Sequence, residues 1–287
     1  MSTGLRIGHV AQVVGIRTTT LRAWEQRYGI VTPIRSETSG YRCYTSSDVD
    51  RLRHMRALVE SGVAVNRAAA IVARSEPFGD GPADVSGHDA LVRAGRFFNG
   101  ADLARLLDDA FAAGPVEDVI EHWLLPSMHA VGAAWESGRM TVAAEHFVAA
   151  AVMRRLGALF DATPAGSPRV VVGLPPHGHH EIPALAFAVC LRRRGMDVLY
   201  AGADVPLESW GRLAAEWAPR MVVTVATMAD DVPNADAVGA VLREAGVPAV
   251  YVGGANATAV PSAIPLPLSM TASADVLVEA ASAKRWK

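Results

Sequence analysis

The sequence predicts a multidomain protein in which a small helical domain, a four-helix bundle and an α/β domain with a parallel sheet follow one another. Three observations lead to this prediction. Short amphipathic helical patterns fill residues 1–75, longer ones fill residues 88–162, and residues 169–287 alternate between short β-rich runs and helical runs. Residues 76–87 are rich in Pro, Gly and Asp and are predicted to be a linker. A chain of 287 residues is long enough for this number of domains.

The N-terminal segment has the pattern of a winged helix-turn-helix. A first helix is predicted up to Gly15 by apolar residues at helical spacing: Ile7, Val10, Ala11 and Val14. Thr18 is predicted to cap a second helix, 19–28, which Gly29 ends. Two short helices around a glycine turn are typical of a helix-turn-helix. Residues 33–44 are predicted to be extended and to form the β-hairpin wing.

Charge is distributed unevenly along the chain. Residues 1–75 contain eleven arginines and five acidic residues, a net charge of +6, so the remainder carries −8 of the total of −2. Arginine forms bidentate contacts with phosphate and guanine that lysine cannot form. A basic domain attached to an acidic body therefore predicts double-stranded DNA as a partner. Further helices at 48–58 and 65–74 complete the predicted domain.

The N-terminal motif resembles the MerR family. The resemblance covers residues 5–75 and depends on Thr20-Leu21-Arg22-Ala23-Trp24-Glu25-Gln26-Arg27-Tyr28-Gly29 and Gly40-Tyr41-Arg42-Cys43-Tyr44. It implies that the second helix enters the major groove while the wing contacts the DNA backbone, and that the protein is a homodimer, or a tetramer, on a two-fold operator. The residues expected to contact DNA are Thr18, Thr19, Arg22, Arg27, Tyr28, Arg35, Tyr41 and Arg42. For Trp24 and Tyr28 a core position between helix and wing is the alternative.

The remainder of the chain predicts two further folds. Residues 88–160 are helical by periodicity, with turns or helix starts at Gly114-Pro115 and Leu125-Pro126, which suits a four-helix bundle. A Rossmann-like parallel sheet, covered by helices on both faces, is predicted from alternating strands (169–174, 197–201, 220–226, 249–252) and helices (182–194, 207–217, 234–245, 273–283). In such a sheet ligands bind beyond the C-terminal ends of the strands.

Two patterns in these folds resemble the cobalamin-binding half of the light-sensing MerR repressors of the CarH/LitR type. Trp135 is followed, after nine residues, by Glu145-His146, and His180-Glu181-Ile182-Pro183 follows the first strand of the sheet. The resemblance extends over about residues 90–270 and implies a repressor controlled by adenosylcobalamin, and by light, with the ligand held between bundle and sheet. The implied cofactor residues are His180 as the axial ligand of cobalt, Glu181 as its orienting partner, Trp135, Glu145 and His146 over the adenosyl group, and Thr224, Gly253 and Gly254 around the nucleotide tail.

Three positions depart from the family pattern. Gly178 stands where the family has an acid two residues before the histidine, Pro183 stands where it has a glycine, and Glu136 follows the tryptophan where light-sensing members can carry a histidine. Two alternatives therefore stay open: a different chromophore, tetrapyrrole or small effector, or no ligand at all, with control by oligomerisation or a protein partner. For Trp135 and His146 a plain core position in the bundle is the alternative. The imidazoles of His177, His179 and His180 could also hold zinc, although no cysteine nearby completes a set of four ligands.

Other classes of protein are disfavoured. No apolar stretch approaches the roughly 20 residues that span a bilayer, and the N-terminus lacks the pattern of a signal peptide. Cys43 and Cys190 suggest no disulfide framework, so a cytoplasmic protein is expected. An enzyme that uses cobalamin for methyl transfer or rearrangement is disfavoured too, because no domain is left to activate a substrate once residues 1–75 are assigned to DNA.

Overall fold

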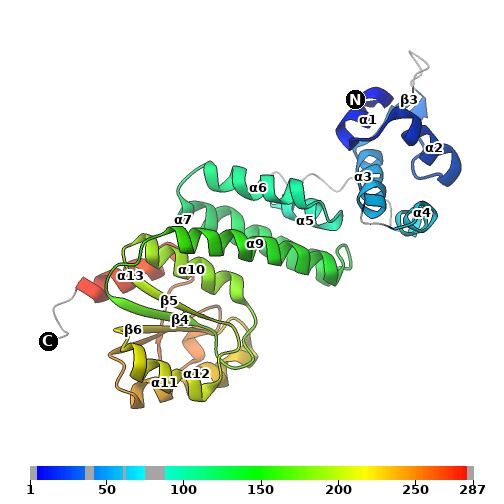
Figure 1. Cartoon of the computed structure of the whole chain (residues 1–287). Helices are drawn as coiled ribbons and strands as arrows, with labels where there is room; N and C mark the ends of the chain where they lie inside the picture. Colours follow the sequence, from blue (N-terminus) through cyan, green and yellow to red (C-terminus); the bar gives the residue numbers. More distant parts are fainter. Residues whose placement is uncertain (1–4, 36–41, 61–62, 75–87, 283–287) are drawn as a thin grey trace. The chain divides into compact units, whose positions relative to one another are not determined.

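The computed structural model describes residues 5–35, 42–60, 63–74 and 88–282 (Figure 1). The chain divides into two compact units, one made of residues 1–103 and 130–147 and the other of residues 104–129 and 148–287. The predicted linker 76–87 and the wing tip, including Tyr41, lie outside the described residues. Within the described part, none of the helices is both long and apolar enough to cross a membrane.

The N-terminal part of the first unit is a small helical domain with a three-stranded antiparallel sheet in the order β1-β3-β2. Its elements are β1 (Leu5–Arg6), α1 (Ile7–Val14), α2 (Thr18–Tyr28), β2 (Ile34–Arg35), β3 (Arg42–Tyr44), α3 (Ser46–Glu60) and α4 (Val65–Arg74). The helix ends at Gly15 and Gly29 are confirmed, and both glycines have left-handed φ angles of 71° and 59°. Strand β1 was not predicted, because two residues carry no periodicity.

The predicted cap of the second helix was wrong. Thr18 is the first residue of α2, and Arg17 holds the N-cap position with an extended backbone and no side-chain cap. The Arg17 carbonyl accepts the first helical hydrogen bond, from the Leu21 N–H at 3.0 Å. Thr18 therefore has helical backbone angles, and its exposed side chain lies on the surface of α2.

The middle of the chain contains four helical stretches, as predicted. They are α5 (Asp89–Arg96), α6 (Gly100–Ala112), the continuous run of α7 (Val116–Val119), η1 (Ile120–Leu124) and α8 (Leu125–Glu136), and α9 (Val142–Ala162). Pro115 is the N-cap of α7, as the Gly114-Pro115 turn predicted. The helix start predicted at Leu125-Pro126 coincides with the first residue of α8, although the chain is already helical before it. Here η1 is a π-helical turn in which the Leu125 N–H bonds to the Ile120 carbonyl, and this wider turn accommodates Pro126, which has no N–H to donate.

The second unit contains the predicted parallel sheet, with strands in the order β5-β4-β6-β7-β8. The strands are β4 (Arg169–Gly173), β5 (Asp197–Gly202), β6 (Met221–Val225), β7 (Ala249–Gly253) and β8 (Ile264–Pro265). The helices are α10 (Glu181–Arg193), α11 (Leu207–Trp217), α12 (Val232–Glu244) and α13 (Met270–Ser282), with short 3-10 turns η2 (Ala229–Asp231) and η3 (Ala257–Ala259). Strand β8 was not predicted, for the same reason as β1.

Helices cover both faces of this sheet (Figure 1). Val170 and Val172 of β4 pack in one core with residues of α10 and α13. Val171, between them, packs in a second core with residues of α11 and α12. This alternation buries both sides of each strand and explains the continuous apolar runs in the sequence. The C-terminal ends of the strands and the loops that follow them are where a ligand of such a sheet is expected to bind.

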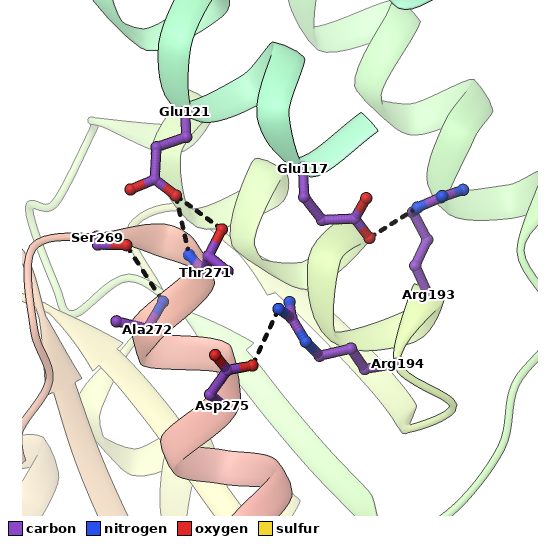
Figure 2. A network of polar contacts seen from close by, with 8 residues as sticks. All are labelled: Glu117, Glu121, Arg193, Arg194, Ser269, Thr271, Ala272 and Asp275. Atoms are coloured by element: carbon purple, nitrogen blue, oxygen red, sulfur yellow. Dashed lines mark hydrogen bonds and ion pairs between the residues drawn. The ribbon is translucent and has the colours of Figure 1, made fainter. Parts of the chain in front are cut away.

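A polar network in the second unit joins α7 and η1 to the helices α10 and α13 (Figure 2). The carboxylate of Glu121 accepts hydrogen bonds from the N–H and the hydroxyl of Thr271, at 3.1 and 2.8 Å. One turn earlier, Glu117 pairs with Arg193 at 2.9 Å. A further ion pair between α10 and α13 completes the network. These contacts fix the start of α13 and the loop that precedes it.

Candidate functional site

Helix α2 has one buried side and one exposed polar side. Leu21 and Trp24 are buried in the domain core, which confirms the core alternative for Trp24. The exposed side carries four of the residues expected to contact DNA: Thr18, Thr19, Arg22 and Arg27. Gln26 is exposed as well and follows Arg22 by four residues, so both lie on the same face. Sequence reasoning missed Gln26, although its helical spacing from Arg22 was visible.

The wing is tied to α2 through Glu25. The hydroxyl of Tyr44 donates to one carboxylate oxygen of Glu25 at 3.0 Å, and Nε of Arg42 lies 3.4 Å from the other. Tyr44 is fully buried, and burial together with the bond to Glu25 raises the pKa of its hydroxyl. The side chain of Arg42 stays 44% exposed, so it is accessible while paired. Tyr28 is half-buried against the same core, and for Arg35 the structure describes the backbone, in β2.

Two arginines of the basic segment have structural roles. Arg51 donates from Nε to the carbonyl of Ile30 at 2.8 Å. Arg56 donates to the carbonyl of Val14 at 2.6 Å and pairs with Glu60. Both arginines come from α3, and they satisfy backbone carbonyls at the C-terminal end of α1 and just after α2. Part of the positive charge of residues 1–75 therefore stabilises the domain.

The residues expected to cover the adenosyl group lie in the first unit. Trp135, near the end of α8, is 48% exposed, so the alternative that it is a core residue is wrong. Gly138, with a φ of 71°, follows the end of α8, and α9 then begins at Val142. Glu145 and His146 are neighbours in the first turn and a half of α9, and their side chains are paired at 2.6 Å with His146 largely exposed. The unit thus presents an accessible indole and an accessible imidazole–carboxylate pair.

In the second unit His180 stands at the end of the β4–α10 loop, at the N-cap position of α10, with an exposed side chain. Glu181, the expected partner of His180, accepts a hydrogen bond from Tyr200 at 3.1 Å through Oε1, and its partnership with His180 stays a prediction. Burial and this carboxylate raise the pKa of the Tyr200 hydroxyl. Pro183 lies in the first turn of α10, where its missing N–H leaves no bond unmade. Among the described residues no three His, Cys, Asp or Glu side chains are grouped closely enough to hold a metal ion, which goes against the zinc alternative.

The ends of β6 and β7 fit a ligand. Thr224 is fully buried in β6, and within the described part of the chain its hydroxyl has no hydrogen-bond partner. At Gly253 a side-chain carbon would meet nothing within 4 Å, so space remains beside the end of β7. Gly254 has a φ of +100°, and a side-chain carbon there would lie 2.5 Å from the carbonyl oxygen of Ala226. An unpartnered hydroxyl, an open position and an exposed imidazole on one sheet are compatible with cobalamin and its nucleotide tail.

Comparison with known proteins agrees with this arrangement. Residues 5–75 match the model of the MerR HTH family of regulatory proteins, and residues 88–160 match the B12 binding domain. The HTH-type transcriptional repressor CarH of Myxococcus xanthus is 34% identical over 268 residues, which cover 88% of this chain and 89% of that protein. The chain belongs to the MerR family. Within the family it groups with the CarH type, since the repressor CarA of Myxococcus xanthus is also 36% identical over 206 residues, 70% of this chain and 69% of CarA.

The match of this MerR-family member to the B12 binding domain supports cobalamin as the class of ligand. A solved structure, the monomethylamine corrinoid protein of Methanosarcina barkeri, superposes with a TM-score of 0.56 at 20% identity and covers 69% of this chain and 100% of that one. At this identity the likeness shows the fold, and it confirms the predicted Rossmann-like sheet. The two Myxococcus relatives are transcriptional repressors, which supports a regulatory and not a catalytic role.

Proposed function

We propose that this protein is a transcriptional repressor that binds a two-fold DNA operator as a homodimer or tetramer and is controlled by adenosylcobalamin and light. Its functional parts are then residues 1–75 for DNA and residues 88–162 and 169–287 for the ligand. One observation carries the proposal: a single chain joins a helix-turn-helix with an exposed arginine face to a sheet whose strand ends expose an imidazole and bury an unpartnered hydroxyl. The predicted location for such a protein is the cytoplasm.

For DNA binding, α2 is the element that enters the major groove. Arg22 and Gln26 can reach base edges, and Thr18 and Thr19 at its start can reach phosphates. Arg27 and Tyr28 at the end of the helix, with Arg35, Tyr41 and Arg42 of the wing, complete the DNA-contacting set. Because Glu25 binds both Tyr44 and Arg42, strand β3 of the wing is tied to α2, and the two can meet the duplex together.

For the ligand, His180 supplies the imidazole that binds cobalt, and Thr224, Gly253 and Gly254 accommodate the nucleotide tail. Trp135, Glu145 and His146 contact the adenosyl group. When bound, the cofactor would supply a light-sensitive cobalt–carbon bond. The protein responds only if the ligand binds one assembly of protomers more tightly than another, because a ligand with equal affinity for both shifts nothing.

Purified full-length protein tests this proposal. We expect it to take up adenosylcobalamin in the dark, with a corrinoid absorbance spectrum and a change in oligomer mass, and to bind operator DNA in a way that illumination reverses. His180→Ala is the matched variant, and its DNA affinity should no longer change with adenosylcobalamin or with light. A protein that stays colourless and keeps its mass when adenosylcobalamin is added contradicts the proposal. In that case the spectrum of the protein isolated from its host separates the alternatives, since another tetrapyrrole and an empty protein look different.

A further inference from the structure

Backbone hydrogen bonds, among them Val205 N–H to the Leu174 carbonyl at 3.2 Å, and one carboxylate fasten the loop that carries His180 to a neighbouring loop. In the β5–α11 loop, Oδ1 of Asp204 accepts a hydrogen bond from the backbone N–H of His177 at 2.7 Å. In return the N–H of Asp204 donates to the carbonyl of Gly178 at 3.1 Å. Both His177 and Asp204 have left-handed φ angles, 64° and 49°. Two loops separated by 27 residues thus hold each other in a conformation that most residues avoid.

At Gly178, where the family has an acid, a side chain would fit only if its neighbours shifted by a few tenths of an ångström. A side-chain carbon at Gly178 would lie 3.0 Å from the carbonyl oxygen of Pro175 and 3.1 Å from the side chain of Leu174. The N–H of Gly178 closes a tight turn onto the same Pro175 oxygen at 2.9 Å. Glu181, the other acid near His180, is engaged with Tyr200. The carboxylate that bonds to the backbone of this loop comes instead from Asp204, in the loop that follows β5.

We infer that Asp204 is the positioning residue for the cobalt ligand in this protein. The inference rests on the proposed binding of cobalamin and adds to it the residue that orients the loop of His180. A metal-binding histidine is oriented by hydrogen bonds in its surroundings, and their loss weakens metal binding about 10- to 100-fold. Asp204 performs this task through the backbone and does not touch the imidazole of His180.

Asp204 positions the loop through the backbone N–H of His177 and not through the imidazole of that residue. Nδ1 of His177 lies 4.0 Å from Oδ1 of Asp204, too far for a hydrogen bond, and the side chain is 83% exposed. Removal of the imidazole should therefore leave the loop unchanged, while removal of the carboxylate should loosen it at His177 and leave the backbone bonds of Asp204 and Val205 in place. An amide oxygen accepts an N–H bond as a carboxylate does, so asparagine should replace Asp204.

Asp204→Gly, Asp204→Asn and His177→Ala, made in the full-length protein, test the inference. Glycine removes the carboxylate, keeps the N–H that bonds to Gly178 and suits the left-handed φ, so this variant should fold. The probe is cobalamin reduced to the Co(II) state, whose electron paramagnetic resonance spectrum reports a nitrogen ligand, on protein with 15N-labelled histidine. We expect Asp204→Gly to bind cobalamin about tenfold more weakly, with a partial loss of the histidine signal. Asp204→Asn, His177→Ala and the control Glu216→Ala, an exposed position on α11, should match the wild type.

The outcomes separate the inference from the proposed function. If wild-type protein takes up no cobalamin, the proposed function fails and this inference fails with it. If the wild type binds through a histidine that His180→Ala removes, and Asp204→Gly keeps both affinity and signal, only the inference is overturned. Loss of the signal in His177→Ala or in Asp204→Asn also overturns it, because the imidazole or the charge would then be what matters. Equal melting temperatures of the cobalamin-free variants exclude a general loss of structure.

Discussion

The surface of α2 and the loops at the C-terminal strand ends are the two functional regions of this molecule, and they are built differently. On α2 the backbone is a regular helix, and Arg22 and Gln26 project from it into solvent. At the strand ends the backbone itself is unusual, with left-handed residues at 177, 204 and 254 held by contacts between loops. On the helix, each exposed side chain therefore contributes to function independently of the others. In the loops it depends on a backbone shape that several distant residues maintain together.

The largest effect is expected where an exposed side chain of α2 is removed. Arg22→Ala should weaken operator binding about 10- to 100-fold, because a bidentate contact to a base is worth about 1–3 kcal/mol. Its thermal stability should not change. Arg56→Ala is the matched change, because it removes the hydrogen bond to the Val14 carbonyl and should lower the free energy of unfolding by about 1–3 kcal/mol. Fluorescence anisotropy with labelled operator and urea unfolding measure the two quantities. If Arg22→Ala unfolds the domain or leaves DNA binding intact, the claim that the exposed side chains of α2 serve DNA binding and not stability is contradicted.

A smaller effect is expected at adjacent glycines of the strand-end loops. Gly254→Ala forces a methyl group against the Ala226 carbonyl at a φ of +100°, which should cost about 1–3 kcal/mol of unfolding free energy. Gly253→Ala is its control, because a methyl group there meets nothing within 4 Å, so stability should hold while it competes with a ligand for the same space. Thermal unfolding measures the stability of both variants, and cobalamin titration measures their affinity for the ligand. Equal losses of stability at the two positions would contradict the view that the function of these loops depends on their backbone conformation.

The same contrast explains what could be predicted from the sequence. The helices of the N-terminal domain and the strands of the sheet follow from periodicity and glycine positions, and the face of α2 follows from helical spacing. Strands β1 and β8 have two residues each and carry no such pattern. The helix start at Leu125 was predicted, but the π-helical turn that joins it to α7 was not, since no sequence pattern marks such a turn.

Side-chain partners were the part of the site that the sequence could not reveal. Glu181 adjoins His180, and adjacency predicted that the two would interact. In the folded protein Tyr200 of β5 bonds to Glu181, and Asp204, in the loop just after β5, bonds to the loop that carries His180. These pairs are 19 and 27 residues apart, and only the parallel pairing of β4 with β5 brings them together. Periodicity describes each element separately and carries no information on such contacts.

The smallest effect is expected at the loop after β8, the edge strand opposite β5, which a carboxylate also holds. Burial alone would raise the pKa of Glu121, but hydrogen bonds from Ser269 and Thr271 outweigh it and lower that pKa below the ordinary 4.5. The stability that Glu121 contributes is therefore fully present above about pH 4.5 and is lost as the pH falls through its folded pKa. Glu121→Gln keeps an oxygen acceptor for Thr271 and removes the titration, so at neutral pH it should cost less than about 1 kcal/mol, because the group is partly exposed. Urea unfolding at a series of pH values should give a shallower acid dependence for this variant than for the wild type. Parallel curves would mean that this loop is held by packing, and that Asp204 is a special case among the carboxylates of the sheet domain.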